Sequence, residues 1–164
     1  MINALKKAKD TKNPIVVHLN TQKGEGYAPA EAHREEFHFS APYDVADGEP
    51  LQQSNEPNYI TNTRDYLLRK VKENLELLII SSATPEVFGF MEKERKACGN
   101  QYVDVAIAEQ TGVSTMAGAA RGGAKVIYPV MATFLQRAYD QLEQDWAMDN
   151  SPASCRLWEL VFVP

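Results

Sequence analysis

The chain has 164 residues, of which 44% are hydrophobic, and a formal net charge of −5. This size allows one globular core with an appendage, and an acidic balance with scattered Lys and Arg disfavours nucleic acid and anionic membranes as partners. No apolar run reaches the roughly 20 residues of a membrane-spanning helix and the first residues lack a signal-peptide pattern, so we expect a soluble, cytoplasmic protein.

The first part of the chain predicts little regular structure. Residues 2–9 are Lys-rich and typical of a helix, and the apolar run at residues 14–19 predicts a buried strand that ends in a glycine-rich turn at residues 23–27. Residues 28–58 show no hydrophobic period and contain several Pro and Gly, which indicates a long ordered loop. Such a loop is uncommon inside one domain. We therefore predict three parts: residues 1–27, a linker at 28–58, and residues 59–164.

From residue 59 onward, strand and helix patterns alternate. Asn62 or Thr63 can cap a first helix, and Thr133 can cap a later one whose core-facing stripe is formed by Leu135, Ala138, Tyr139, Leu142 and Trp146. Further helices are predicted at residues 87–97 and 109–120. The predicted strands are residues 77–80, 102–105, 125–131 and 154–163. Strands that alternate with helices predict an α/β fold, with a parallel sheet flanked by helices on both faces.

Three stretches of the sequence resemble one enzyme family. They are residues 107–110 (Ile-Ala-Glu-Gln), residues 133–141 (Thr-Phe-Leu-Gln-Arg-Ala-Tyr-Asp-Gln), and residues 18–31, which contain Lys-Gly-Glu-Gly-Tyr. Together they resemble the 1-deoxy-D-xylulose-5-phosphate synthases, transketolase-like enzymes that use thiamine diphosphate. The resemblance implies that residues 59–164 are an incomplete transketolase-type pyrimidine-binding domain. It also implies that residues 1–27 are the C-terminal end of a diphosphate-binding domain.

Glu109 is the strongest candidate for chemistry. It follows an apolar approach and opens a predicted helix, whose free N–H groups favour a carboxylate. The resemblance implies that Glu109 is catalytic and binds the cofactor, because the family's glutamate hydrogen-bonds a ring nitrogen of the aminopyrimidine and promotes its imino tautomer. The alternative is a first-turn acid that only complements the helix dipole, which is the commoner role of such a residue.

Phe134 and Arg137 lie three residues apart, on a face other than the apolar stripe of their predicted helix. By resemblance, Phe134 stacks on the cofactor's pyrimidine. Arg137 binds the substrate phosphate, to which a guanidinium can donate two parallel hydrogen bonds. The alternatives are a core position for Phe134 and a surface ion pair between Arg137 and Asp140 or Asp145.

Lys23 and His38 are the candidates in the first part of the chain. By resemblance, Lys23 lies near the cofactor phosphates, where glycines let the backbone approach a ligand. His38 is implied to be catalytic, since an imidazole can move a proton near neutral pH. Its alternative is an exposed loop histidine, which is also how we interpret His33. We interpret His18 as a structural residue within a strand.

The family holds Mg²⁺ in a Gly-Asp-Gly motif, a hard-oxygen site. This chain lacks the motif, so no metal ligand is assigned to it. Thr111 and Met131 stand where the family usually has His and Tyr, which bears on substrate specificity more than on the type of cofactor. Cys98 and Cys155 lie far apart without a nearby second ligand, which predicts reduced thiols.

The intact enzyme implied by the resemblance condenses pyruvate with glyceraldehyde 3-phosphate to 1-deoxy-D-xylulose 5-phosphate and CO₂, for isoprenoid and thiamine synthesis. It uses thiamine diphosphate and Mg²⁺ and is a homodimer. Because the metal motif is missing, we expect the chain to be inactive alone, as a truncated product or a divergent relative. The alternatives are a subunit of a split transketolase-like enzyme and a non-catalytic interaction module.

Overall fold

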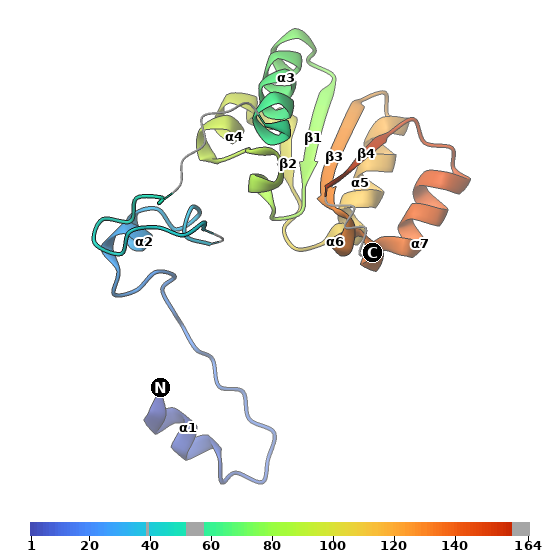
Figure 1. The fold of residues 1–164 in the computed structure, drawn as a ribbon. Helices are drawn as coiled ribbons and strands as arrows, with labels where there is room; N and C mark the ends of the chain where they lie inside the picture. The colour runs from blue at the N-terminus through green and yellow to red at the C-terminus, as the bar shows by residue number, and fades with distance from the viewer. Residues whose placement is uncertain (39, 52–57, 159–164) are drawn as a thin grey trace, which may run out of the picture. The chain divides into compact units, whose positions relative to one another are not determined.

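The chain divides into two units, residues 1–55 and 56–164 (Figure 1). The structure, a computed structural model, describes residues 1–38, 40–51 and 58–158. Our boundaries after residues 27 and 58 stay predictions. No helix within these described ranges is long and apolar enough to cross a membrane.

The first unit contains two short helices, α1 (Ile2–Ala8) and α2 (Ala28–Ala32), joined by an extended segment. The buried strand predicted at residues 14–19 is wrong, because no strand forms there and Ile15 and Val16 are 57% and 92% exposed. His18, predicted to lie inside that strand, is exposed as well. A strand needs a neighbour to satisfy its backbone N–H and C=O groups, and the described residues of this unit provide none.

The end of the first unit folds around three aromatic rings. Phe37 meets Tyr27 and Tyr43 edge-on, with ring centroids 5.7 and 4.9 Å apart, and Tyr27 stacks on Tyr43 at 6.0 Å. Gly48 has a φ of 84°, and a Cβ there would lie 2.7 Å from a Pro29 side-chain carbon. Within residues 28–38 and 40–51, the loop predicted at residues 28–58 packs around these rings and contains the short helix α2, and residues 39 and 52–57 lie outside the described residues.

The second unit is built on a four-stranded, all-parallel sheet with the strand order β2-β1-β3-β4. Its strands are β1 (Leu77–Ser81), β2 (Tyr102–Asp104), β3 (Lys125–Met131) and β4 (Ser154–Trp158). The predicted α/β fold with a parallel sheet flanked by helices is confirmed. Apolar runs bounded by turn residues located these strands, and β3 matches its predicted range in full. The last strand was predicted to continue to residue 163, and the part after residue 158 lies outside the described residues.

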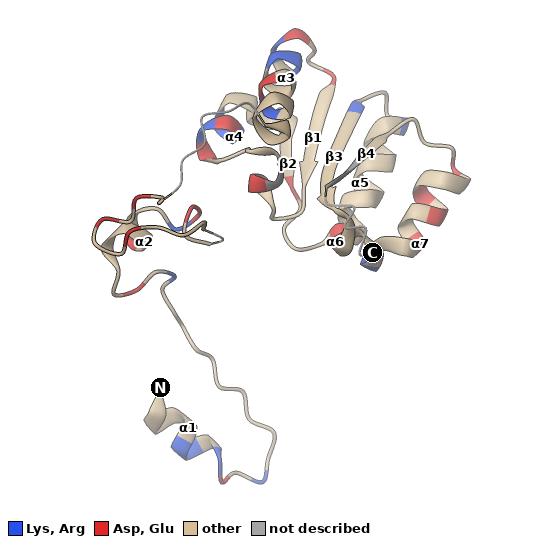
Figure 2. Cartoon of the chain, in the orientation of Figure 1, with Lys and Arg blue, Asp and Glu red and all other residues tan. Residues whose placement is uncertain are grey.

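Helices cover both faces of the sheet (Figure 1). One face carries α3 (Tyr59–Glu73), the 3₁₀ turn η1 (Pro85–Phe88) and α4 (Glu92–Cys98), which leads through η2 (Gly99–Gln101) into β2. The other face carries α5 (Glu109–Arg121) and the helical run after β3. Adjacent residues of a strand point to opposite faces, so Ile79 and Ile80 belong to two separate core clusters. Figure 2 shows both signs of charge on α3 and α4, whereas in β1 and β3 only Lys125 is charged.

The start of α3 differs from the prediction. The Asn58 side chain accepts a hydrogen bond from the Thr61 N–H at 2.9 Å, and Thr61 Oγ1 accepts one from the Asn58 N–H at 3.1 Å. This reciprocal capping box replaces the predicted caps Asn62 and Thr63, which lie inside the helix. Similarly, the helix predicted at residues 87–97 is two pieces, η1 and α4, separated by Gly89 with a φ of 68°.

The helical run after β3 is not one regular helix. It consists of α6 (Ala132–Leu135), the 3₁₀ turn η3 (Gln136–Ala138), α7 (Tyr139–Gln141) and the π-helix η4 (Leu142–Met148). α6 follows β3 without a break, so Thr133 is not its cap. Leu135 and Ala138 are buried as predicted, but Tyr139 is 67% exposed. A 3₁₀ turn has three residues per turn rather than 3.6, so it shifts the phase of the predicted stripe.

Candidate functional site

The topology of the sheet places the candidate residues of the second unit at one edge. The connection after β1 passes over the face covered by α4, whereas the connection after β3 passes over the face covered by α5. Adjacent strands whose connections leave in opposite directions form a crevice at their carboxyl ends, where open α/β sheets bind ligands. The starts of α5 and α6 lie at this carboxyl edge (Figure 1). Glu109 is the first residue of α5, and Phe134 and Arg137 lie in α6 and η3 directly after β3.

Glu109 is the first residue of α5 and is only 3% exposed. The unpaired N–H groups at the start of a helix favour a negative charge there. A charge taken out of water still requires a partner, and Arg137 provides one, with its Nη1 atom 3.2 Å from Glu109 Oε2. This ion pair joins α5 to the helical run after β3, two elements that the sequence separates by a whole strand.

The hydrogen bonding of Glu109 is incomplete. Its Oε2 atom is buried but accepts no hydrogen bond within the part of the chain that the structure describes, since the Arg137 contact has the distance of an ion pair without the geometry of a hydrogen bond. Buried polar atoms in native proteins nearly always have a hydrogen-bond partner. A carboxylate with an unused acceptor at the carboxyl edge of the sheet is therefore suited to a ring nitrogen of a bound heterocycle.

Phe134 and Arg137 lie about one helical turn apart. Phe134 is 41% exposed, so the alternative of a core position is wrong. The alternative of a surface pair between Arg137 and Asp140 or Asp145 is not what the structure shows, because Arg137 pairs with Glu109. Asp145 instead accepts a hydrogen bond from Ser114 at 2.5 Å. An exposed aromatic ring and a half-exposed guanidinium on one turn can stack on a flat ligand and bind an anion.

A pair of buried hydroxyls supports the start of α5. Tyr128 of β3 is fully buried, and its Oη atom lies 2.6 Å from Ser82 Oγ. Burial raises the pKa of Tyr128 to about 12; the Ser82 hydrogen bond opposes this rise and the charge of Glu109 adds to it. Gly112 provides the space for this phenol, because a Cβ there would lie 2.6 Å from Tyr128 Oη. Tyr128 is thus a neutral hydroxyl within electrostatic reach of Glu109.

Lys23 and His38 belong to the first unit, and the structure brings these two together. Lys23 Nζ forms a hydrogen bond with His38 Nδ1, and both side chains are exposed. Gly24 has a φ of 82°, which fits the predicted glycine-rich turn. Lys23 and His38 are therefore in contact within the first unit, and Glu109 and Arg137 are in contact within the second.

Sequence reasoning missed Asp104, the last residue of β2. Its Oδ1 atom accepts hydrogen bonds from the backbone N–H groups of Ala83, at 3.1 Å, and Ala106, at 2.8 Å. The sequence contained a signal for one of these bonds. An Asp at the end of a strand commonly accepts from the N–H two residues later, in an Asx turn.

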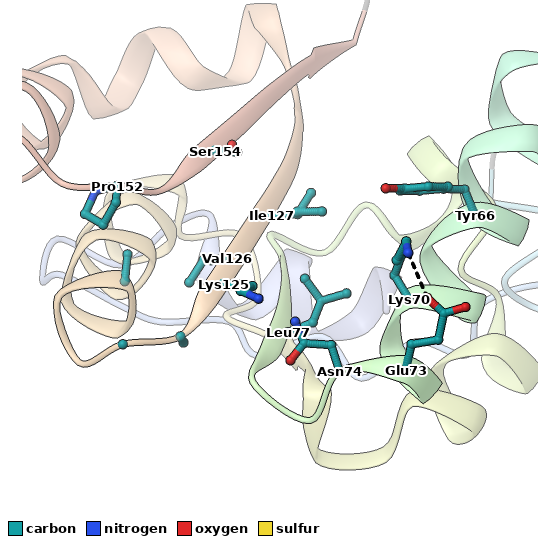
Figure 3. Close-up of a pocket in the computed structure, with 13 residues that line it drawn as sticks. Tyr66, Lys70, Glu73, Asn74, Leu77, Lys125, Val126, Ile127, Pro152 and Ser154 are labelled. Atoms are coloured by element: carbon teal, nitrogen blue, oxygen red, sulfur yellow. Dashed lines mark hydrogen bonds and ion pairs between the residues drawn. The ribbon is translucent and has the colours of Figure 1, made fainter.

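A cavity of about 930 Å³ lies at the opposite edge of the sheet (Figure 3). It is lined by α3 and by the amino ends of β1, β3 and β4, with Lys70 paired to Glu73 at 2.7 Å. No candidate residue lines this cavity.

Among the described residues, no group of three or more His, Cys, Asp or Glu is placed to hold a metal ion. Cys98 and Cys155 are free thiols, and burial raises the pKa of Cys155 to about 11.

Comparison with known proteins identifies relatives of this chain, although no family model matches it. The chain is 37% identical over 150 residues to the 1-deoxy-D-xylulose-5-phosphate synthase of Pelotomaculum thermopropionicum. It is 39% identical over 153 residues to the enzymes of the same name from Yersinia pestis (strain Pestoides F) and Cronobacter sakazakii. These matches cover 92–93% of this chain but only 23–25% of the relatives. The resemblance is confirmed: the chain is a partial homologue of this enzyme and spans about a quarter of the length of the curated relatives it matches.

Proposed function

We propose that this partial homologue forms the pyrimidine-binding part of a thiamine diphosphate-dependent enzyme that condenses pyruvate with glyceraldehyde 3-phosphate. In this proposal residues 59–164 are an incomplete transketolase-type pyrimidine-binding domain, and residues 1–27 are the end of a diphosphate-binding domain. The observation that carries the proposal is Glu109, a carboxylate that is 3% exposed at the carboxyl edge of a parallel sheet and has an oxygen that accepts no hydrogen bond from the described residues.

The second unit supplies the proton chemistry and the substrate contact in this proposal. Glu109 binds a ring nitrogen of the aminopyrimidine and exchanges a proton with it, and its burial at the start of α5 keeps water away from the carboxylate. Phe134 offers its exposed ring for stacking. Arg137 holds Glu109 with one nitrogen and keeps donors on its exposed side for a substrate phosphate. Thiamine diphosphate, when bound, supplies the electron sink for the loss of CO₂ from a 2-oxo acid.

The first unit supplies a cation and an imidazole. Lys23 is suited to a diphosphate because its ammonium is exposed beside a glycine turn. His38 is suited to a substrate hydroxyl, since its imidazole is exposed beside Lys23 and an imidazole can move a proton near neutral pH. Mg²⁺ takes oxygen ligands, and we assign none of them to this chain. We therefore propose that the chain alone is inactive, and that the working assembly is a homodimer like that implied by the resemblance.

A chimaeric enzyme tests the proposal. Residues 14–152 of this chain replace the matching segment of the Yersinia pestis enzyme, and turnover of pyruvate with glyceraldehyde 3-phosphate is measured. We expect the chimaera to be active. E109Q should lower kcat by about 10²- to 10⁴-fold, the usual contribution of a general acid–base residue. E143Q, at an exposed glutamate of η4, is the matched control and should keep full activity. An E109Q chimaera with undiminished turnover would falsify the proposal.

Calorimetric titration of thiamine diphosphate and Mg²⁺ into the unfused chain separates the proposal from its alternatives. We expect no binding by the chain alone, because no Mg²⁺ ligand is assigned to it. Binding that appears only with a second protein carrying the metal site would favour a split enzyme. A folded but inactive chimaera, together with no binding in any mixture, would favour a non-catalytic interaction module.

A further inference from the structure

We propose that Asp104 is a positioning residue that sets the direction of the Glu109 carboxylate by holding two strained turns at the carboxyl edge of the sheet. This inference rests on the proposed role of Glu109. It adds to that site a residue that touches neither cofactor nor substrate and acts through the backbone.

Two alanines at this edge have left-handed backbone conformations. Ala83, which follows β1, has a φ of 56°, and Ala106, which follows β2, has a φ of 60°. A residue with a Cβ is strained in this region. Such a conformation persists only where surrounding contacts hold it, and it is common at functional sites. Each of the two turns therefore needs a contact that holds its alanine in the left-handed conformation.

One carboxylate oxygen restrains both turns. Asp104 Oδ1 accepts from the Ala83 N–H at 3.1 Å and from the Ala106 N–H at 2.8 Å. Strand pairing places Ser81 of β1 opposite Asp104 of β2, and the Val105 N–H donates to the Ser81 carbonyl at 2.9 Å. Asp104 thereby fixes the ends of two neighbouring strands against each other.

The second turn leads directly to Glu109. The Ala108 N–H donates to the Ala106 carbonyl at 2.7 Å, and α5 begins at the next residue. No side chain among the residues that the structure describes caps α5, so the direction of its first residue depends on the turn that precedes it. A change of φ at Ala106 would therefore move the Glu109 carboxylate relative to Arg137, its partner across the site.

The interaction free energy between Glu109 and Arg137 reports the position of the Glu109 carboxylate. A double-mutant cycle with E109Q and R137Q, followed by urea unfolding, isolates the pairwise contribution. With Asp104 present we expect a coupling of about fivefold in the unfolding equilibrium constant, within the range for residues in contact. D104N retains an oxygen acceptor, so the coupling should persist. D104A removes the acceptor and should reduce the coupling to less than about twofold.

The double variant D104A/A106G separates positioning from stability. Glycine adopts a positive φ without strain, so this variant should recover most of the stability lost in D104A while the coupling stays lost. It also carries the test if D104A alone does not fold. Coupling that is unchanged in D104A/A106G, or lost in D104N, would overturn the proposal. The cycle needs no cofactor, so its failure would remove the role of Asp104 and leave the chimaera's test of Glu109 unaffected.

Discussion

At the scale of single residues, Gly112 determines how closely α5 can approach β3 under the candidate site. A Cβ at this position would lie 2.6 Å from Tyr128 Oη and 2.7 Å from Tyr128 Cζ, with Ser82 Oγ at 3.1 Å. Tyr128 is fully buried and its hydroxyl is held by Ser82, so neither neighbour can move without losing contacts. Gly112 is thus required by packing rather than by backbone conformation.

We expect G112A to lower the free energy of unfolding by about 1–3 kcal/mol, the usual cost of overpacking a filled core. Urea denaturation measures this change. G118A is the matched control on the same helix, because no neighbouring atom of the described residues lies within 4 Å of a Cβ there. It should raise the free energy of unfolding by roughly 0.5–1 kcal/mol, since glycine in a helix interior is less stable than alanine. Equal effects of the two substitutions would contradict the packing role of Gly112.

At the scale of elements, α3 depends on its capping box. N58A removes the acceptor for the Thr61 N–H at the first turn of the helix. We expect a loss of about 1 kcal/mol in the free energy of unfolding, the typical value for an N-cap. N62A is the control: Asn62 is exposed inside the helix, where alanine has the higher helix propensity. If N62A costs as much as N58A in a urea titration, the cap is misassigned.

At the scale of the whole molecule, the buried phenol of Tyr128 and the partly buried phenol of Tyr102 make the second unit sensitive to alkali. Burial raises the pKa of both Tyr102 and Tyr128 from 10.0 to about 12. Each phenol keeps its proton more tightly in the folded state than in the unfolded state. The stabilisation is therefore complete below pH 10.0 and is lost as the pH rises to about 12.

We expect the urea midpoint of unfolding to fall across this pH range, in parallel with the ultraviolet absorbance of tyrosinate. Y128F removes one of these two phenols, so the midpoint should fall less steeply with pH. Y139F, at a tyrosine that is 67% exposed, should leave the slope unchanged. A midpoint that is independent of pH in the unsubstituted chain would contradict the burial of these phenols.

The sequence by itself determined the order of elements in the second unit and the place of Glu109 at the start of a helix. Alternating apolar periods identified the strands and the start of α5, because periodicity reports which local face is buried. Only the tertiary structure decided the partners across elements. The pair of Glu109 with Arg137 and the two bonds of Asp104 join segments that follow different strands, so they depend on strand order and register. The same reason explains the exposed segment at residues 14–19: an apolar run predicts a strand, but a sheet forms only where a second strand is available to pair with it.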